Sequence, residues 1–457
     1  MNDRFTLINA RIGAPPYGEE LAQLQITAGR WHTIAPQSHL VEEPSAIPIT
    51  ELRVEDAMDH AVVDLQGRML LPGLVDSHMH LDKSFSLPQV GNVSGTLSEA
   101  VRNYAKASPF FEKEEIKARI VRASLQALSF GSTTLRSHLD FNLRAGREVA
   151  LRTIEAALEA RELVKPYIDI QYFPMCPLDQ LDDASMAVVE EALRMGVDGL
   201  GGAPHLSSTP EADIERIFEL AVRYGCPIDL HADESDDPNV RTVLKIAELT
   251  QRYDYQGKVS VGHLCSLASM NAADAALVID SIAKAQLKAV SLPAANLYLQ
   301  GRGDSEGPIR RGVTRIRQLR DSGVTVAVAS DNIHDPFHPF GRGDLLQIAL
   351  LAGYAGHLGS CEDMRTLLEL ISTSAADYAG VANYGIATGN PADFVVIDAA
   401  FPEEAFTMLP ASRWVSKGGR WVSCSTTSRQ WGNKQLEQVW QNAASRVQPG
   451  APIVTIH

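Results

Sequence analysis

Residues 71–85 read LPGLVDSHMHLDKSF and place two histidines one residue apart, directly after an apolar run. In an extended segment residues i and i+2 point the same way, so His78 and His80 are predicted to lie on one face of a strand end. Two interpretations fit this pair taken alone. The histidines are either ligands of a metal ion or ordinary polar residues that close a buried strand.

Short apolar runs like this one recur along the middle of the chain. They alternate with longer helix-like stretches such as 115–129 and 211–224, at intervals of roughly 30 residues. Near-continuous apolar runs are typical of buried parallel strands, and eight β-then-α units are the number that closes a (β/α)8 barrel. The eight runs are 70–78, 131–141, 167–175, 196–205, 227–234, 258–265, 288–296 and 324–332.

Both ends of the chain have a different pattern. Stretches 5–12, 21–35, 385–399 and 413–423 read as short strands, and Gly418–Gly419 suits a hairpin turn. We therefore predict an α/β protein with two parts. Residues 66–384 form a metal-dependent TIM barrel, and residues 1–65 and 385–457 form a small composite β-sandwich domain.

Composition excludes several classes of protein. The net charge of −15 comes without a basic block that could follow a phosphate backbone, so nucleic acid is not an expected partner. The five scattered cysteines include no CxxC pair, which argues against a disulfide framework or a cysteine zinc site. The sequence has no uninterrupted apolar span of 18 residues and no signal-peptide pattern at its start, so we expect a cytoplasmic protein without a membrane partner.

Ionisable side chains fall at the ends of several predicted strands, where a TIM barrel places its chemistry. His231 follows the fifth run and Asp331 ends the eighth. Together with His78 and His80 they make three nitrogen ligands and one carboxylate, a set that suits one Zn or Fe ion with a position left for water. Such an ion would lower the pKa of its water toward neutrality.

Hydrolysis at this site also needs groups that move protons and stabilise charge. Glu234 lies three residues beyond His231 and could carry the water proton to the leaving group, while Asp331 could accept a hydrogen bond from that water. His263 ends the sixth run and could donate to the oxygen on which charge develops. The alternatives are a solvated acidic loop for Glu234 and a packed core histidine for His263.

Other polar residues are less informative. His138 fits either a partner of the ligands or strand-end packing, and the sequence does not place His205, His334 or His338. Lys83 is either a substrate contact or a surface lysine. The fourth run, 196–205, contains no lysine to bridge two metals, so a single metal per subunit is expected.

These motifs resemble the amidohydrolase superfamily, and within it the bacterial cytosine deaminase and N-isopropylammelide hydrolase subgroup. The resemblance covers most of the chain and implies the same barrel, a mononuclear iron or zinc site, Glu234 as the acid/base, His263 as the residue that orients water, and a homo-oligomer. The similar stretches are 71–85, 132–140, 227–237, 297–315, 329–347 and 384–399.

The resemblance also indicates how the substrate differs. Met175 stands where cytosine deaminase has a glutamine that grips the pyrimidine, which makes cytosine itself a poor candidate. Lys83 and Asn332 remain as polar substrate contacts, and Phe337 is either a stacking wall or barrel packing. We expect a deaminase or amidohydrolase that cleaves a C–N bond of a small nitrogen heterocycle. The alternatives are ring-opening hydrolysis of a cyclic amide and a non-catalytic barrel that binds a small molecule.

Overall fold

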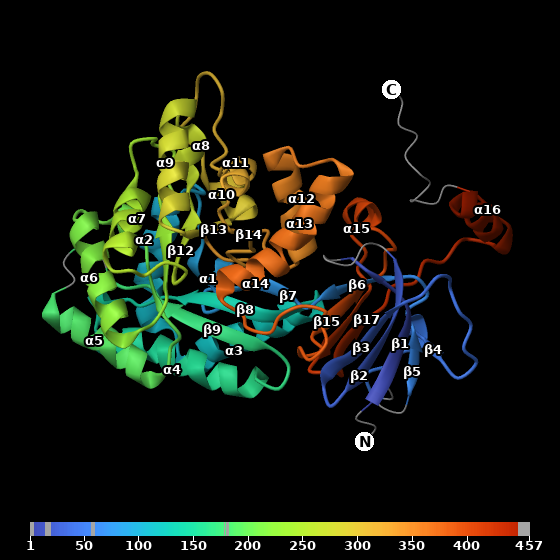
Figure 1. Ribbon diagram of the computed structural model, residues 1–457. Helices are drawn as coiled ribbons and strands as arrows, with labels where there is room; N and C mark the ends of the chain where they lie inside the picture. The colour runs from blue at the N-terminus through green and yellow to red at the C-terminus, as the bar shows by residue number, and fades with distance from the viewer. Residues whose placement is uncertain (1–3, 14–19, 56–59, 178, 180–181, 447–457) are drawn as a thin grey trace. The chain divides into compact units, whose positions relative to one another are not determined.

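The structure is a computed structural model that describes residues 4–13, 20–55, 60–177, 179 and 182–446 (Figure 1). The outermost residues of the predicted β domain, 1–3 and 447–457, lie outside the described part. The chain divides into one unit of residues 1–73, 360–368 and 383–457, and a second of residues 74–359 and 369–382.

The first unit contains a nine-stranded sheet drawn from both ends of the chain. The strands pair in the order β17-β16-β15-β6-β1-β2-β3, and β5 joins β4 to β1. Residues 69–72 belong to this sheet although they lie on the barrel side of the boundary predicted at residue 65. The strands are β1 (Arg4–Ile12), β2 (Leu21–Thr27), β3 (Arg30–Pro36), β4 (Ile47–Pro48), β5 (Val62–Asp64), β6 (Met69–Pro72), β15 (Phe394–Ile397), β16 (Arg413–Lys417) and β17 (Arg420–Ser425).

Alternating side chains of these strands form the core of this unit. The ring of Phe394 lies 5.3 Å from that of Trp31 and 5.1 Å from that of Trp421, measured between centroids. The predicted hairpin turn lies between β16 and β17, where Gly418 and Gly419 have φ values of 54° and 68°. Both values lie in the left-handed region that a tight hairpin requires and that glycine adopts without strain.

The second unit has the α/β content of a TIM-barrel-type fold. Each of the eight predicted runs contains a strand, and the described strands form two parallel sheets, β7-β8-β9 and β10-β11-β12-β13-β14. Isolated parallel bridges join Met175 to Gly201 and Met79 to Asp331. The strands are β7 (Leu74–Met79), β8 (Ser132–Leu139), β9 (Asp169–Pro174), β10 (Leu200–Gly202), β11 (Ile228–Ala232), β12 (Val259–His263), β13 (Lys288–Ser291) and β14 (Val326–Val328).

Amphipathic helices follow these strands. In α6 the buried residues Ile214, Ile217, Phe218 and Ala221 recur at helical spacing, so that one stripe faces the core. Gly225 ends this helix with a φ of 69°, as a left-handed cap. The helices from α1 to α8 are α1 (Leu87–Val90), α2 (Leu97–Ala107), α3 (Lys113–Ser129), α4 (Arg147–Val164), α5 (Asp183–Met195), α6 (Pro210–Tyr224), α7 (Thr242–Arg252) and α8 (Cys265–Ser269).

The remaining helices complete the chain. They are α9 (Ala272–Lys284), α10 (Pro293–Leu299), α11 (Ile316–Asp321), α12 (Leu345–Gly356), α13 (Cys361–Leu370), α14 (Thr373–Ala379), α15 (Pro402–Met408) and α16 (Lys434–Arg446). Over the described ranges, no helix combines the length and the apolar character needed to cross a membrane.

Candidate active site

Backbone hydrogen bonds bring the ends of β7 and β14 together. His78 lies in β7 and His80 follows it, while Asp331 comes shortly after β14. The backbone N–H of Asp331 donates to the carbonyl of His78 at 2.9 Å, and the N–H of His80 donates to the carbonyl of Asp331 at 3.1 Å. The Asp331 carboxylate is thereby held beside the two histidines.

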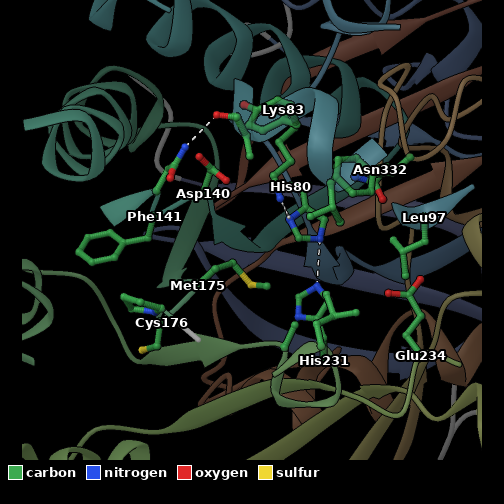
Figure 2. A pocket seen from close by; sticks show the side chains of 18 of the residues that line it. His80, Lys83, Leu97, Asp140, Phe141, Met175, Cys176, His231, Glu234 and Asn332 are labelled. Atoms are coloured by element: carbon green, nitrogen blue, oxygen red, sulfur yellow. Dashed lines mark hydrogen bonds between the residues drawn. The ribbon is translucent and has the colours of Figure 1, made fainter. Parts of the chain in front are cut away.

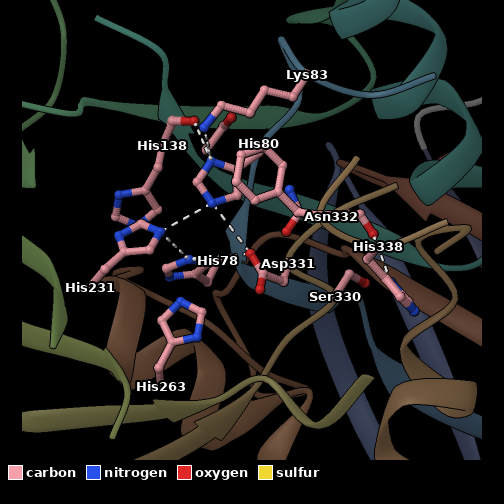
Figure 3. A network of polar contacts seen from close by, with 12 residues as sticks. His78, His80, Lys83, His138, His231, His263, Ser330, Asp331, Asn332 and His338 are labelled. Carbon is pink, nitrogen blue, oxygen red and sulfur yellow. Dashed lines mark hydrogen bonds and ion pairs between the residues drawn. The ribbon is translucent and has the colours of Figure 1, made fainter. Parts of the chain in front are cut away.

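Four of the predicted residues converge on one point (Figure 3). The Nε2 atom of His231, which lies in β11, is 3.1 Å from Nε2 of His78 and 3.1 Å from Nε2 of His80. Oδ1 of Asp331 is 3.7 Å from Nε2 of His78 and 3.3 Å from Nε2 of His80. The structure therefore brings together the four residues that are predicted to be metal ligands.

The protonation of these histidines follows from their burial. All three rings are buried, and burial lowers the pKa of His78, His80 and His231 well below the usual histidine range. The rings are thus neutral near pH 7. Each neutral ring keeps one nitrogen lone pair, which is the form that a metal ligand requires.

The acceptor atoms of this cluster are arranged as if around a cation. Oδ1 of Asp331 is buried and has no hydrogen-bond partner within the described residues, and three imidazole nitrogens crowd beside it. A buried carboxylate oxygen without a partner is costly, and lone pairs that face one another repel. A divalent ion held here would remove both costs. Two overlapping groups have donor atoms close enough together to hold one: His78 with His80 and Asp331, and His78 with His138 and His231.

Two residues of the site have strained backbones. Asp331 has a φ of 63° and His263 a φ of 70°, both in the left-handed region that non-glycine residues rarely adopt. Such a conformation costs on the order of 1 kcal/mol or more at each position. The surrounding hydrogen bonds hold these residues in place against that cost.

A glycine allows the close approach of one ligand. A Cβ atom built on Gly262, in β12, would lie 3.1 Å from Cε1 and 3.3 Å from Nδ1 of His78. That is tighter than ordinary side-chain contacts, so any larger residue would push the imidazole from its place. The absence of a side chain at Gly262 therefore leaves the space in which the His78 ring lies.

His138 and a buried ion pair lie beneath the cluster. The carbonyl of His138 accepts a hydrogen bond from Nδ1 of His80 at 3.1 Å, and its ring lies 4.2 Å from that of His78 between centroids. Nε2 of His138 lies 3.7 Å from Oδ1 of Asp229, whose other oxygen accepts from Arg136 at 2.7 Å. Of the two interpretations of His138, the structure supports a partner of the ligands, since its carbonyl orients His80.

Glu234 and His263 lie together at the edge of the cluster. Oε1 of Glu234 is 3.5 Å from Nδ1 of His263. The Asn296 amide donates to that same nitrogen at 3.0 Å, which leaves Nε2 of His263 as the protonated donor beside the ring of His231. Burial raises the pKa of Glu234 well above its usual range and lowers the pKa of His263 to about 4.

The cluster opens into a cavity of about 310 Å³ (Figure 2). His80, His231, Asp331, Glu234 and His263 form its polar end. The predicted substrate contacts all line it as well, and apolar side chains from α2 and from the loops that follow the strands form its other walls. The predicted contacts are Lys83, Met175, Asn332 and Phe337.

Comparison with known proteins identifies the family of this chain. The sequence profile described as the amidohydrolase family matches residues 61–129 and 142–423.

The chain belongs to the amidohydrolase family.

Several relatives of this amidohydrolase act on heterocycles. It is 33% identical to the pterin deaminase of Rhizobium rhizogenes (strain K84) over 80% of this chain and 83% of that protein. It is 28% identical to the N-isopropylammelide isopropyl amidohydrolase of Pseudomonas sp. (strain ADP), over 78% and 87%. The crystal structure of 5-methylcytosine deaminase from Klebsiella pneumoniae liganded with 5-fluorocytosine matches with 26% identity and a TM-score of 0.83, over 93% and 99%.

These findings confirm the predicted superfamily, and with it a hydrolase and deaminase class of enzyme. The predicted subgroup contained the cytosine and isopropylammelide enzymes, and the similarity to a pterin deaminase was not foreseen. The groups His78–His80–Asp331 and His78–His138–His231, either of which could hold a metal ion, agree with the use of a divalent metal by this family.

The structure also places the histidines that the sequence left open. Nδ1 of His205 donates to the carbonyl of His231 at 3.1 Å, which steadies the backbone of one predicted ligand. His334 bonds the carbonyl of Pro339 at 2.9 Å, within its own loop. His338 bonds the carbonyl of Asn332 at 3.3 Å.

Several residues that line the cavity of this amidohydrolase were not predicted from the sequence, and two of them carry titratable groups next to Lys83. Asp140 follows β8 and Tyr104 lies in α2. Asp140 stands two residues after His138 at a strand end, a position at which an acidic residue could have been noted. Tyr104 lies in a helix whose apolar pattern reads as packing, and no sequence signal distinguishes it.

Proposed function

We propose that this chain is a mononuclear metal-dependent aminohydrolase that deaminates an amino-substituted nitrogen heterocycle of the pterin type. The convergence of His78, His80, His231 and Asp331 at one end of the cavity, with Glu234 and His263 beside them, carries this proposal. Zinc or iron is the expected ion, with one bound per subunit.

The reaction replaces the exocyclic amine of the substrate by oxygen. A divalent ion supplies Lewis-acid chemistry that makes water nucleophilic near neutral pH. Glu234 accepts a proton from the attacking water as the new C–O bond forms, and delivers it to the ring nitrogen beside the attacked carbon. His263 donates a hydrogen bond from Nε2–H to the new oxygen. The remaining O–H proton then passes through Glu234 to the amine, and the C–N bond breaks to release ammonia and leave a C=O group.

The cavity has room for a small heterocycle. Its volume of about 310 Å³ lies at the lower end of the usual range of small-molecule sites, about 300–1,000 Å³. Met175 and Phe337 offer apolar surface on which a fused ring can lie. Asn332 donates one amide N–H to Asp335 at 2.8 Å, which leaves its second N–H and its oxygen for the substrate.

The relatives support the same choice of substrate. The pterin deaminase has a higher identity to this chain than the isopropylammelide enzyme. Met175 removes the hydrogen-bonding group expected for cytosine. We therefore expect pterin to be deaminated faster than cytosine or N-isopropylammelide.

Ammonia release tests the proposal directly. The protein is loaded with zinc or with iron and is incubated with pterin, cytosine and N-isopropylammelide under one set of conditions. Release of ammonia from pterin, with the dione as the second product, supports deamination. Ring opening or no turnover by protein that holds a full equivalent of metal would overturn it.

The finer features of the assembly belong to the same proposal. We infer that the eight strands β7–β14 close into one barrel and that both ends of the chain build one composite β-sandwich domain. A homo-oligomer in the cytoplasm is the expected form. Sedimentation analysis of the purified protein tests the oligomeric state.

A further inference from the structure

The cavity contains more polar side chains than the metal cluster and the acid/base residues use. In a site of this kind, a polar group of the ligand that finds no partner costs on the order of 1–3 kcal/mol. The side chains that remain available for the ligand therefore indicate which heterocycle edge fits. The polar residues in question are Lys83, Asp140, Asn142, Arg144, Asp179 and Asn332.

Most of these side chains are already engaged within the protein. Asn142 donates to the carbonyl of Ala105 at 3.0 Å and to Ser108 at 3.0 Å. Arg144 pairs with Asp179 at 2.9 Å. Asp179 also accepts hydrogen bonds from the backbone and side chains of its neighbouring loop.

Lys83 is nearly free of protein partners. Its ammonium lies 5.1 Å from the ring centroid of Phe337 and 5.5 Å from that of Tyr104, and the residue is only 7% exposed. Its hydrogen-bond contact is Nδ1 of His80 at 3.4 Å, a nitrogen whose proton already points at the carbonyl of His138. Lys83 therefore keeps donors that a ligand can use.

Asp140 is the acceptor on the same side of the cavity (Figure 2). Its backbone N–H donates to Oδ2 of Asp82 at 3.0 Å, which ties the end of β8 to the loop that carries Lys83. Burial raises the pKa of the Asp140 carboxyl to about 6, and the nearby charge of Lys83 opposes that rise, so the group is largely ionised near pH 7. A carboxylate has about four lone-pair positions, so acceptors remain for a ligand.

A free donor beside a free acceptor matches one edge of a lactam. The carbonyl of a lactam accepts, and its neighbouring ring N–H donates. We propose that Asp140 is a specificity-determining residue that accepts the ring N–H of a 2-amino-4-oxo heterocycle while Lys83 donates to the adjacent carbonyl. This inference rests on the proposed deaminase function and adds the tautomer that the enzyme selects.

The expected kinetic effect follows from the strength of a hydrogen bond to a charged group. Losing such a bond costs roughly 10- to 100-fold in binding or rate. Asp140→Asn and Lys83→Met should each lower kcat/KM for pterin by about this factor. Activity on 2,4-diaminopteridine, which has no lactam edge, should change much less, so the preference of the parent enzyme for pterin should shrink.

The experiment measures both substrates with each variant and with Asp183→Asn, a matched change at an exposed carboxylate of α5. Metal content and melting temperature are recorded for every protein. The proposal is overturned if Asp140→Asn lowers kcat/KM for both substrates by the same factor. It is also overturned if this variant loses metal or keeps the full preference for pterin. Asp140→Glu serves as a second variant should Asp140→Asn fold poorly, and it should retain more of the preference.

Binding separates this inference from the proposed function. Calorimetric titration with lumazine, the dione that carries the lactam edge but has no amine to lose, needs no turnover. Weaker lumazine binding by Asp140→Asn and Lys83→Met supports the subsite even if the parent enzyme fails to deaminate pterin. The opposite result is that the parent enzyme deaminates pterin while both variants bind lumazine as tightly as the parent does. That result would contradict the proposed subsite and would leave the proposed deaminase function supported.

Discussion

Oε1 of Glu234 lies 3.5 Å from Nδ1 of His263, and the same nitrogen accepts a hydrogen bond from Asn296. The proton of the His263 ring therefore resides on Nε2. Glu234, which transfers protons, and His263, which donates a hydrogen bond, therefore lie side by side with separate roles.

Replacing Glu234 by glutamine keeps the size of the side chain and removes its proton transfer. General acid–base catalysis contributes about 10²- to 10⁴-fold, so we expect kcat to fall by that range. Metal content should stay at the parental level because Glu234 is not among the four converging ligands. Steady-state ammonia release together with elemental analysis checks both expectations, and a kcat within threefold of the parent would contradict the assigned role.

Removing a converging imidazole should abolish metal binding. Even loss of a group that only orients a ligand weakens metal affinity by about 10- to 100-fold, and His231→Ala should cost more. Elemental analysis after dialysis against a chelator measures the effect. The control is His39→Ala, because His39 is exposed in the first unit and lies outside the cluster. A full equivalent of metal in His231→Ala would refute the shared site.

Gly262→Ala tests whether the space beside His78 matters. The added methyl group would meet the imidazole at 3.1 Å, so we expect metal affinity to fall by about 10- to 100-fold, as for other displaced ligands. Gly303→Ala is the matched control, since a Cβ there meets nothing within 4 Å and its backbone is not left-handed. Competition with a chromophoric chelator compares the two proteins, and equal affinities would count against a positioning role.

The ion pair beneath the cluster predicts a change in stability. Arg136 and Asp229 are both buried and joined at 2.7 Å, so Asp229→Asn leaves a buried guanidinium uncompensated. The free energy of unfolding should fall by about 3–5 kcal/mol. Tyr378→Phe removes one hydrogen bond of 2.8 Å to the Asp229 carboxylate and keeps its charge, so it should cost less, about 1.5 kcal/mol. Urea denaturation measures both, and equal effects would contradict this assignment.

The sequence could predict the parts of the site that depend on strand periodicity. The i, i+2 spacing of His78 and His80 placed both rings on one face, and barrel topology brought His231 and Asp331 to the same rim. These residues lie in strands or within three residues of a strand end, so their positions need little knowledge of loops. Their roles as ligands remain a prediction that the metal measurements test.

Features that depend on packing between distant segments could not be read in this way. Asn296, in the short helix α10, fixes the tautomer of His263. The need for glycine at position 262 is evident only from the close approach of the His78 ring to that position. Asp140 and Lys83 likewise line the same cavity because the backbone of Asp140 bonds Asp82, in the loop that carries Lys83. The boundary predicted at residue 65 missed β6, because its apolar residues run straight into those of β7.

The left-handed backbones of Asp331 and His263 affect how this enzyme can be engineered. Glycine relaxes such a conformation, so a library sorted only for heat resistance would be drawn toward replacing these two residues. The most heat-resistant variants from such a library would then lack catalytic activity. Each round of selection therefore has to assay catalytic turnover as well as heat resistance.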